Sequence, residues 1–196
     1  EVQAVIVRDR RLRWPVSHDI ELNLSGNKIQ SVRRRAKYIL FETTSGTAML
    51  HLGMSGSVRI IDQDEPAGKH DHLDIRFKNG NALRFRDPRR FGSFLWTDDP
   101  SKHRLLQHLG PEPLSTAFNG EYLWMKSRAR KVRIKQFIMN ASIVVGVGNI
   151  YASEALFSSG IHPKRRANRI SSLRMIKLVA AIQDVLQRAI KAGGTT

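Results

Sequence analysis

Short stretches of alternating apolar and polar residues fill the first half of the chain, and this alternation is typical of half-buried β-strands. Turn-forming residues separate several of the stretches, and Asn79-Gly80 between two of them predicts a β-hairpin. Seven such strands in succession favour an antiparallel β-sandwich or barrel. The expected strands cover Val2–Trp14, Val32–Thr43, Thr47–Leu52, Ser57–Asp62, His72–Lys78, Ala82–Arg86 and Ser93–Thr97.

After Asp98 the apolar residues recur at the three-to-four-residue spacing of helices. The expected helices cover Ser101–Leu109, Asn119–Arg128, Ile134–Met139, Asn149–Ser158 and Ser172–Ala192. The apolar face of the last helix is expected to carry Ile176, Val179, Ile182, Leu186 and Ala189. The sequence therefore predicts an α+β protein, with an antiparallel β-sandwich domain in residues 1–100, a boundary at residues 101–115 and a helical domain in residues 116–196.

The chain is strongly basic, with 33 Lys and Arg against 17 Asp and Glu in 196 residues. A net charge of +16 opposes compaction by self-repulsion, so a polyanionic partner is expected. Basic residues lie along the whole chain and no apolar run approaches membrane-spanning length, which favours nucleic acid over a membrane surface. The lack of cysteine excludes disulfides and thiolate metal sites within these residues and fits a reducing cytoplasm.

The segment Gly146-Val147-Gly148-Asn149 stands at the start of an expected helix and suits phosphate binding. The free N–H groups of a helix N-terminus attract anions, and glycines let a phosphate oxygen approach them. Asn149 can cap the helix or donate its side-chain amide to the same oxygen. A tight turn between two helices is the alternative interpretation, and the surrounding basic charge favours the phosphate.

Two runs of basic residues are expected to have different roles. RARKVRIK (residues 128–135) precedes the glycine segment. Such a run is usually a solvated face, but this one adjoins a second expected helix start and would add salt-dependent affinity for phosphates, with Lys135 as a candidate. RRRAK (residues 33–37) lies on an expected strand, beside the apolar residues that follow it. Lys37 is then either an edge-strand charge or a functional amine, and spacing alone favours the edge charge.

Two loop motifs place a large apolar side chain among glycines or arginines. HLGMSG (residues 51–56) sets Met54 between two glycines, and DPRRFG (residues 87–92) sets Phe91 close to Arg89. Single exposed apolar residues are common on protein surfaces, yet apolar side chains on the loops of a basic protein also suit insertion between bases.

The segment HDHLD (residues 70–74) contains metal-ligand residue types two positions apart, which share one face when they lie on a strand. No carboxylate cluster elsewhere in the sequence completes such a site, so no metal is expected in this chain. A phosphate contact by one of the histidines of this segment is the favoured interpretation.

Seven motifs follow one another along the chain: RRRAKYIL, HLGMSG, KHDHLD, DPRRFG, HLGPEPL, FNGEYL and VVGVGNIYASEALFSSGIHP. Their combination and order resemble bacterial formamidopyrimidine-DNA glycosylases over essentially the whole chain. The resemblance implies a β-sandwich domain and a helical domain with a helix–two-turn–helix motif, which together clamp damaged duplex DNA. It also implies a base-excision repair enzyme, a DNA glycosylase and AP lyase that excises 8-oxoguanine and formamidopyrimidines and cuts the strand by β,δ-elimination.

The same resemblance implies roles for single residues. Met54, Arg89 and Phe91 match three residues that fill the gap left by a flipped base, with Arg89 facing the orphaned cytosine. Lys37 falls on the active-site lysine of the family, which is tied to β-elimination. The implied DNA-binding residues are His70, Arg89, Arg130, Gly146, Gly148 and Asn149.

Two features of the family are missing from the sequence. The family begins with Pro-Glu, and the proline amine attacks C1′ of the damaged nucleoside, whereas this chain begins Glu1-Val2-Gln3 and Glu1 aligns with an inner strand. The four-cysteine zinc finger of the family, which binds one structural zinc, is also missing, so no cofactor is expected here. Residues 1–196 are therefore expected to bind DNA without efficient glycosylase activity.

The expected partner is damaged double-stranded DNA, bound by a monomer. The expected location is the bacterial cytoplasm, where binding to DNA would place the protein at the nucleoid. One alternative is a non-catalytic module that recognises bent, gapped or damaged DNA. The other is an endonuclease VIII-like glycosylase for oxidised pyrimidines, but HLGMSG lacks the Gln-Leu-Tyr loop of that group, which favours oxidised purines.

Overall fold

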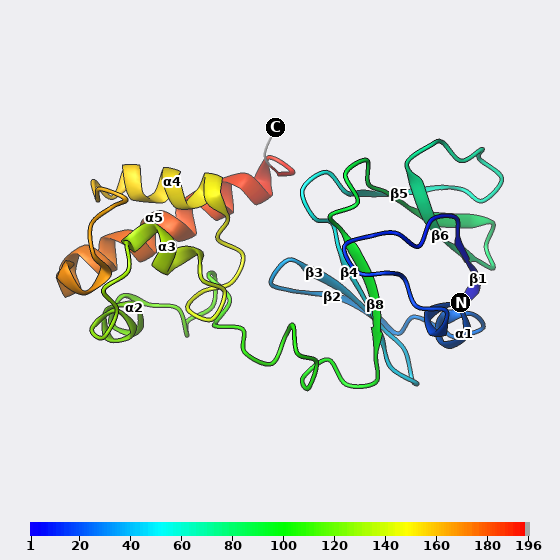
Figure 1. Ribbon diagram of the computed structural model, residues 1–196, viewed down its shortest axis with the longest axis horizontal. Coiled ribbons are helices and arrows are strands. Elements are labelled where there is room, and N and C mark those ends of the chain that lie inside the picture. Colours follow the sequence, from blue (N-terminus) through cyan, green and yellow to red (C-terminus); the bar gives the residue numbers. More distant parts are fainter. Residues whose placement is uncertain (195–196) are drawn as a thin grey trace. The chain divides into compact units, whose positions relative to one another are not determined.

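The computed structural model describes residues 1–194 and divides the chain into two compact units, Glu1–Gln107 and His108–Thr196. We call the first the β unit and the second the helical unit, after the elements that Figure 1 shows in each. Each unit has its own hydrophobic core, formed by residues of that unit.

Two antiparallel sheets of four strands each form the β unit within the described residues (Figure 1). The first sheet has the strand order β1 (Val2–Val7), β6 (Asp71–Phe77), β7 (Asn81–Arg86), β5 (Ser57–Asp62). The second has the order β2 (Ser31–Arg35), β3 (Tyr38–Glu42), β4 (Thr47–His51), β8 (Ser93–Thr97). Leu50, Phe85 and Phe94 come from both sheets and are buried in one core. The expected antiparallel β-sandwich is therefore confirmed.

The first strand is shorter than the expected Val2–Trp14, because β1 ends at Val7. Beyond it, Leu12 and Val16 are buried from a loop instead of a strand. Their N–H groups both donate to the carbonyl of Arg10, which closes the loop on itself. The apolar residues in this stretch therefore reflect burial in the core without strand geometry.

A short helix, α1 (Asp19–Leu24), follows this loop and was not expected from the sequence. It buries Ile20 and Leu24 and packs against β1 and β8. Six residues are too few for the helical period to stand out from the surrounding pattern.

The expected strand Val32–Thr43 is in fact a hairpin. β2 ends at Arg35, β3 begins at Tyr38, and these two residues pair with each other. Ala36 has a φ of 54°, in the left-handed region, which costs an alanine of the order of 1 kcal/mol. No Gly, Asn or Asp marks the reversal in the sequence. Lys37 therefore lies in a two-residue loop at the tip of the hairpin, not on a strand.

Four α-helices and one 3-10 helix form the helical unit within residues 108–194 (Figure 1). They are α2 (Gly120–Ser127), α3 (Ile134–Met139), α4 (Asn149–Ser158), η1 (Ala167–Arg169) and α5 (Ser172–Lys191). The sequence predicted all four α-helices to within one residue at each end, and missed η1. Across residues 1–194 no helix combines the length and the apolar character that crossing a membrane requires.

The buried face of α5 differs from the expected one. Ile176 was expected in the core but is 51% exposed, whereas Met175 and Leu178 are fully buried. The reason is that α5 packs against both α2 and α4, so its buried face is wider than one stripe. Val179 and Ile182 lie on this face, as expected.

The expected helix Ser101–Leu109 is wrong, because these residues form successive turns. The Asp99 carboxylate accepts hydrogen bonds from the N–H and the hydroxyl of Ser101, which favours a turn over a helix. Leu106 is the buried residue of the segment, so no continuous apolar face stabilises a helix here.

Candidate nucleic-acid interface

Two loops of the β unit, one after β4 and one after β7, meet at a single pocket. Met54 lies on the first loop and is 71% exposed, and Arg89 and Phe91 lie on the second. The Arg89 guanidinium carbon is 4.7 Å from the centroid of the Phe91 ring. These three side chains line a pocket of about 610 Å³, together with Arg13, His51, Gly53 and Arg90. The structure therefore brings together the three candidate gap-filling residues.

Gly53 allows the two loops to approach each other closely. Its φ is 68°, and a Cβ at this position would lie 2.5 Å from the carbonyl carbon of Phe91. Both the backbone conformation and the available space therefore require a glycine. The glycine in front of Met54 is thus explained by the contact between the loops.

His51, at the end of β4, lines the same pocket and received no role from the sequence. Burial lowers the pKa of His51, and the nearby charges of Lys37 and Arg13 lower it further, so the ring is neutral at pH 7. The N–H of Gly53 donates to Nδ1 at 2.9 Å, which leaves the ring proton on Nε2. Nε2 can therefore donate to an acceptor in the pocket. The signal for His51 in the sequence is its place at the head of HLGMSG.

Lys37 is exposed and lies beside this pocket. Its positive charge acts on His51, and the ring of the adjacent Tyr38 is 4.9 Å from the His51 ring. The interpretation of Lys37 as an edge-strand charge is wrong, because the residue lies outside both β2 and β3. The hairpin instead carries a primary amine close to the candidate gap-filling residues.

His70 lies directly before β6, at the base of the second loop. Its carbonyl accepts a hydrogen bond from the N–H of Asp87 at 3.0 Å. His72 is 1% exposed, and its Nε2 lies 2.7 Å from the Asp87 carbonyl oxygen. The HDHLD segment therefore does not gather metal ligands, and residues 1–194 contain no cluster of three or more metal-ligand side chains.

Asp74, the last residue of that segment, is the centre of a buried ion cluster. Arg84 donates to its two carboxylate oxygens at 2.9 and 2.8 Å, and Arg8 adds a further hydrogen bond. Burial alone would raise the pKa of Asp74, but the hydrogen bonds from both arginines outweigh it and lower the pKa to about 2. This carboxylate therefore stabilises the sandwich and takes no part in the pocket.

The turn before α4 presents N–H groups to solvent. Gly146 has a φ of 79°, which favours glycine, and Gly148 occupies the N-cap position with extended backbone. The proposed cap by Asn149 is wrong, because Asn149 is the first helical residue and the N-cap is Gly148, which makes no side-chain hydrogen bond to the helix. The free N–H groups, the helix dipole and the exposed Asn149 can therefore bind an anion together.

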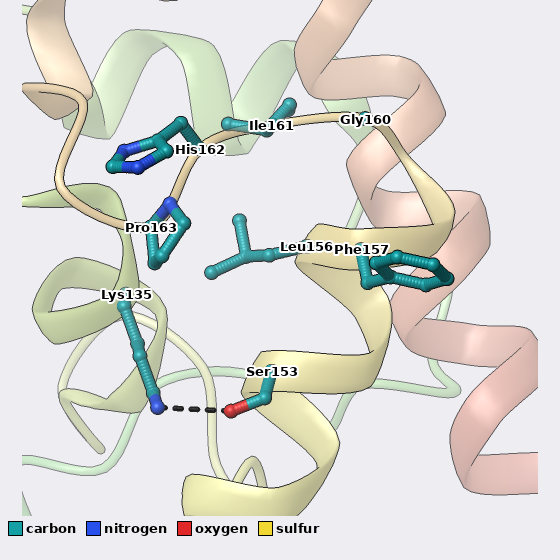
Figure 2. A pocket seen from close by; sticks show the side chains of 8 residues that line it. All are labelled: Lys135, Ser153, Leu156, Phe157, Gly160, Ile161, His162 and Pro163. Carbon is teal, nitrogen blue, oxygen red and sulfur yellow. Dashed lines mark hydrogen bonds between the residues drawn. The ribbon is translucent and has the colours of Figure 1, made fainter.

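Lys135, in the first turn of α3, reaches across to α4. Its Nζ donates to Ser153 Oγ at 2.9 Å (Figure 2). That hydroxyl donates to the carbonyl of Asn149 at the same distance. The structure thus brings Lys135 close to the start of α4. Lys135 and Ser153 both line the pocket of about 620 Å³ in Figure 2, whose lining is mostly apolar and includes Leu156 and Ile161.

The basic run before α3 contains residues of two kinds. The Arg128 guanidinium donates to the carbonyl of Ile170 at 2.8 Å and lies over the ring of Trp124, so it packs within the helical unit. Arg130 is exposed, and its backbone carbonyl accepts from the N–H of Asn168. Arg130 therefore has a fixed backbone and an accessible positive charge.

Comparison with known proteins matches nearly the whole chain to two family models. Residues 1–94 match the formamidopyrimidine-DNA glycosylase N-terminal domain, and residues 109–196 match the formamidopyrimidine-DNA glycosylase H2TH domain. The chain belongs to the formamidopyrimidine-DNA glycosylase family. The resemblance seen in the sequence motifs is therefore confirmed.

Curated formamidopyrimidine-DNA glycosylases are similar to the whole chain. The relative from Stutzerimonas stutzeri is 55% identical over 195 residues, which cover 100% of this chain and 72% of the relative. The relative from Hydrogenovibrio crunogenus is 55% identical over 196 residues, which cover 100% of this chain and 70% of the relative.

Solved structures of the family from Lactococcus lactis have the same fold. One is bound non-covalently to DNA that contains an AP site; it has a TM-score of 0.91 and 30% identity, and the match covers 100% of this chain and 76% of that one. Another is in complex with DNA that contains FAPY-dG. It has a TM-score of 0.90 and 31% identity, and the match covers 100% of this chain and 74% of that one.

Proposed function

We propose that the protein is a base-excision repair DNA glycosylase and AP lyase that removes oxidised purines, namely 8-oxoguanine and formamidopyrimidines, from duplex DNA. The observation that carries the proposal is the pocket of the β unit, where Met54, Arg89 and Phe91 come from two loops and remain accessible. The family assignment and the DNA complexes of the Lactococcus lactis relative support it.

The three pocket residues would fill the gap in the duplex. A glycosylase must take its target base out of the stack, which costs a few kcal/mol and leaves a vacancy. Met54 and Phe91 offer apolar surface to the neighbouring bases, and the Arg89 guanidinium has donors for the orphaned cytosine. The stacking of Arg89 on Phe91 would hold that guanidinium in place.

Phosphate contacts would come from both units. In the helical unit the N–H groups of the turn at Gly146 and Gly148 suit a phosphate, with Asn149, Lys135 and Arg130 as further donors. In the β unit His70 lies at the base of the second loop and is the candidate contact. These contacts give affinity that depends on salt and not on base sequence.

Lys37 would act in strand cleavage. In Schiff-base chemistry the imine withdraws electrons from the sugar, so that a C2′ proton can leave and the 3′ phosphate is eliminated. The accessible amine of Lys37 beside the pocket suits proton transfer in β-elimination. The amine that attacks C1′ in this family is an N-terminal proline, and no residue of the β unit is assigned that role here.

Borohydride trapping on an 8-oxoguanine duplex tests this assignment. A polypeptide confined to residues 1–196 should bind the duplex and form little covalent adduct, whereas a protein that carries the Pro-Glu terminus should be trapped efficiently. A strong adduct from residues 1–196 alone contradicts the assignment of the nucleophile.

A matched duplex with an oxidised pyrimidine tests the substrate class, and preferred cleavage there contradicts the proposed preference for oxidised purines. Binding without cleavage of either duplex by the protein with Pro-Glu would indicate a non-catalytic DNA-binding module.

A further inference from the structure

Asp87 occupies a central position between the two pocket loops, although its own side chain does not line the pocket. It is fully buried. Its Oδ1 accepts a hydrogen bond from Ser55 Oγ at 2.6 Å, and its Oδ2 accepts one from the N–H of Gly92 at 2.7 Å. Ser55 follows Met54 in the first loop, and Gly92 follows Phe91 in the second. One carboxylate therefore connects the two loops.

Further hydrogen bonds extend this connection. Ser55 Oγ also accepts from the N–H of Arg89 at 3.3 Å, so the serine links both loops directly. The backbone N–H of Asp87 donates to the carbonyl of His70, and the His72 ring bonds to the carbonyl of Asp87. The carboxylate is thus held at its base by β6 while its oxygens hold the loops.

We propose that Asp87 and Ser55 are positioning residues that hold Met54, Arg89 and Phe91 as one preformed unit before DNA is bound. The proposal rests on the gap-filling role given under the proposed function. Its physical basis is preorganisation: loops already fixed in the bound arrangement lose little conformational freedom on binding, so more of the contact energy appears as affinity for the gap.

The chemistry at this position favours a carboxylate. Both partners, the Ser55 hydroxyl and the Gly92 N–H, donate toward it, and an ionised carboxylate accepts at both oxygens. An amide at residue 87 could accept at one atom only, so one of the two donors would lose its partner. Asparagine at this position should therefore loosen one loop while keeping the shape of the side chain.

The glycines beside the loops leave little room for them to shift. A Cβ on Gly92 would lie 2.6 Å from Phe85 Cζ and 2.7 Å from the carbonyl oxygen of His51. The contact between Gly53 and Phe91 is equally close. These contacts fix the loops at Gly53 and Gly92, so release of the Ser55–Asp87 bond should loosen only the tip residues around Met54 and Arg89 and should not unfold the sandwich.

Ser55→Ala tests the proposal in the protein without loss of a buried charge. We measure dissociation constants for a duplex with a tetrahydrofuran abasic analogue and for the undamaged duplex. The ratio of the two constants should fall about tenfold, since a hydrogen bond to a charged acceptor is removed. Fluorescence of 2-aminopurine opposite the abasic analogue, which reports insertion into the gap, should change less on binding than with the wild-type protein.

Two control variants distinguish positioning from general stability. Ser57→Ala removes an exposed hydroxyl on β5 and should leave the ratio unchanged. Ser55→Thr keeps the hydroxyl and should restore most of the preference for the abasic duplex. Ser55→Ala leaves one oxygen of the buried Asp87 carboxylate without this donor, so its melting temperature should fall by a few degrees under either role. A purely structural role would weaken binding to both duplexes equally, whereas a positioning role weakens binding to the abasic duplex more.

The measured ratios test the positioning role and the gap-filling function separately. An unchanged ratio in Ser55→Ala, or equal weakening of both duplexes, overturns the positioning role. A wild-type protein with no preference for the abasic duplex overturns the proposed gap-filling function instead. Asp87→Asn should reduce the ratio at least as much as Ser55→Ala, and if that variant does not fold, the serine and threonine variants decide.

Discussion

The β unit and the helical unit carry positive charge in different ways. Residues 1–107 contain 19 Lys and Arg against 13 Asp and Glu, and residues 108–196 contain 14 against four. Many basic side chains of the β unit are paired, as in Arg84 with Asp74, Arg10 with Glu21 and Arg90 with Asp9. Charge balance within the helical unit is impossible with so few acidic residues.

Affinity and selectivity for DNA should therefore come from different units. Ion pairs such as Arg84 with Asp74 and Arg90 with Asp9 hold strands and loops of the β unit in place, so an exposed side chain such as Arg89 lies on a rigid base. The excess charge of the helical unit is available to phosphates, which are the same at every sequence. The β unit should therefore detect the gap, and the helical unit should hold the duplex.

The largest expected effect is on stability and comes from Arg84→Ala. The Arg84 side chain is 1% exposed and its removal leaves the buried Asp74 with fewer donors, so the free energy of unfolding should fall by about 3–5 kcal/mol. Urea denaturation measures the loss. Arg188→Ala breaks an exposed pair with Asp184 on α5 and should have no measurable effect. Equal losses in both variants would contradict the contrast between the units.

The second effect is on selectivity. Arg89→Ala should weaken binding to an abasic-site duplex by roughly thirtyfold, the effect of losing a central arginine contact, and should weaken binding to undamaged duplex much less. Fluorescence anisotropy with the two duplexes measures both constants. An equal loss on the two duplexes would show that Arg89 binds DNA without filling the gap.

The third effect is on salt dependence. Arg130→Ala should lower affinity for damaged and undamaged duplexes alike, because an exposed cation that contacts a phosphate does not distinguish them. The slope of log affinity against log salt concentration should fall by about one. If Arg130→Ala changed the preference between duplexes and left the slope intact, the division of roles between the units would be wrong.

The smallest effect is on the pH dependence of stability. The pKa of His51 is lowered in the folded protein by burial first and then by Lys37, so the unfolded chain binds a proton more readily. The contribution of neutral His51 to the free energy of unfolding is therefore complete above about pH 6.5, and it decreases as the pH falls through the pKa of His51 in the folded protein.

Melting temperatures at pH 7.5 and 5.5 measure this effect. The wild type should have a lower melting temperature at pH 5.5 than at pH 7.5. In His51→Asn the side-chain oxygen can replace Nδ1 as acceptor for the N–H of Gly53, so the melting temperature of this variant should fall less between the two pH values. The Asp74 carboxylate stays ionised in this range because its pKa is about 2. An identical decrease in both proteins would exclude His51 as the source.

Local signals in the sequence predicted most of the fold. Gly80 has a φ of 84° in the hairpin predicted at Asn79-Gly80, and Gly193-Gly194 follows the end of α5 as expected. The misses have physical causes. Ala36 adopts a left-handed conformation that its residue type does not indicate, and α1 is held by burial of two side chains.

Some residues of the candidate site could be found from local sequence motifs, and others only from the structure. Motifs singled out Met54, Arg89 and Phe91, because large apolar side chains among glycines and arginines stand out in a sequence. They gave no role to His51 or Asp87, whose importance depends on contacts between loops more than 30 residues apart in sequence, such as the bond from Ser55 to Asp87. Such contacts become visible only when the strands are paired.

Met54 has most of its side chain in solvent, while the residues on either side of it are fixed by Phe91 and Asp87. The identity of this one side chain is thereby uncoupled from the stability of the sandwich. Exchanges at position 54 should therefore change how well the proposed gap is filled without lowering the stability of the sandwich, so this tip can vary independently of the fold.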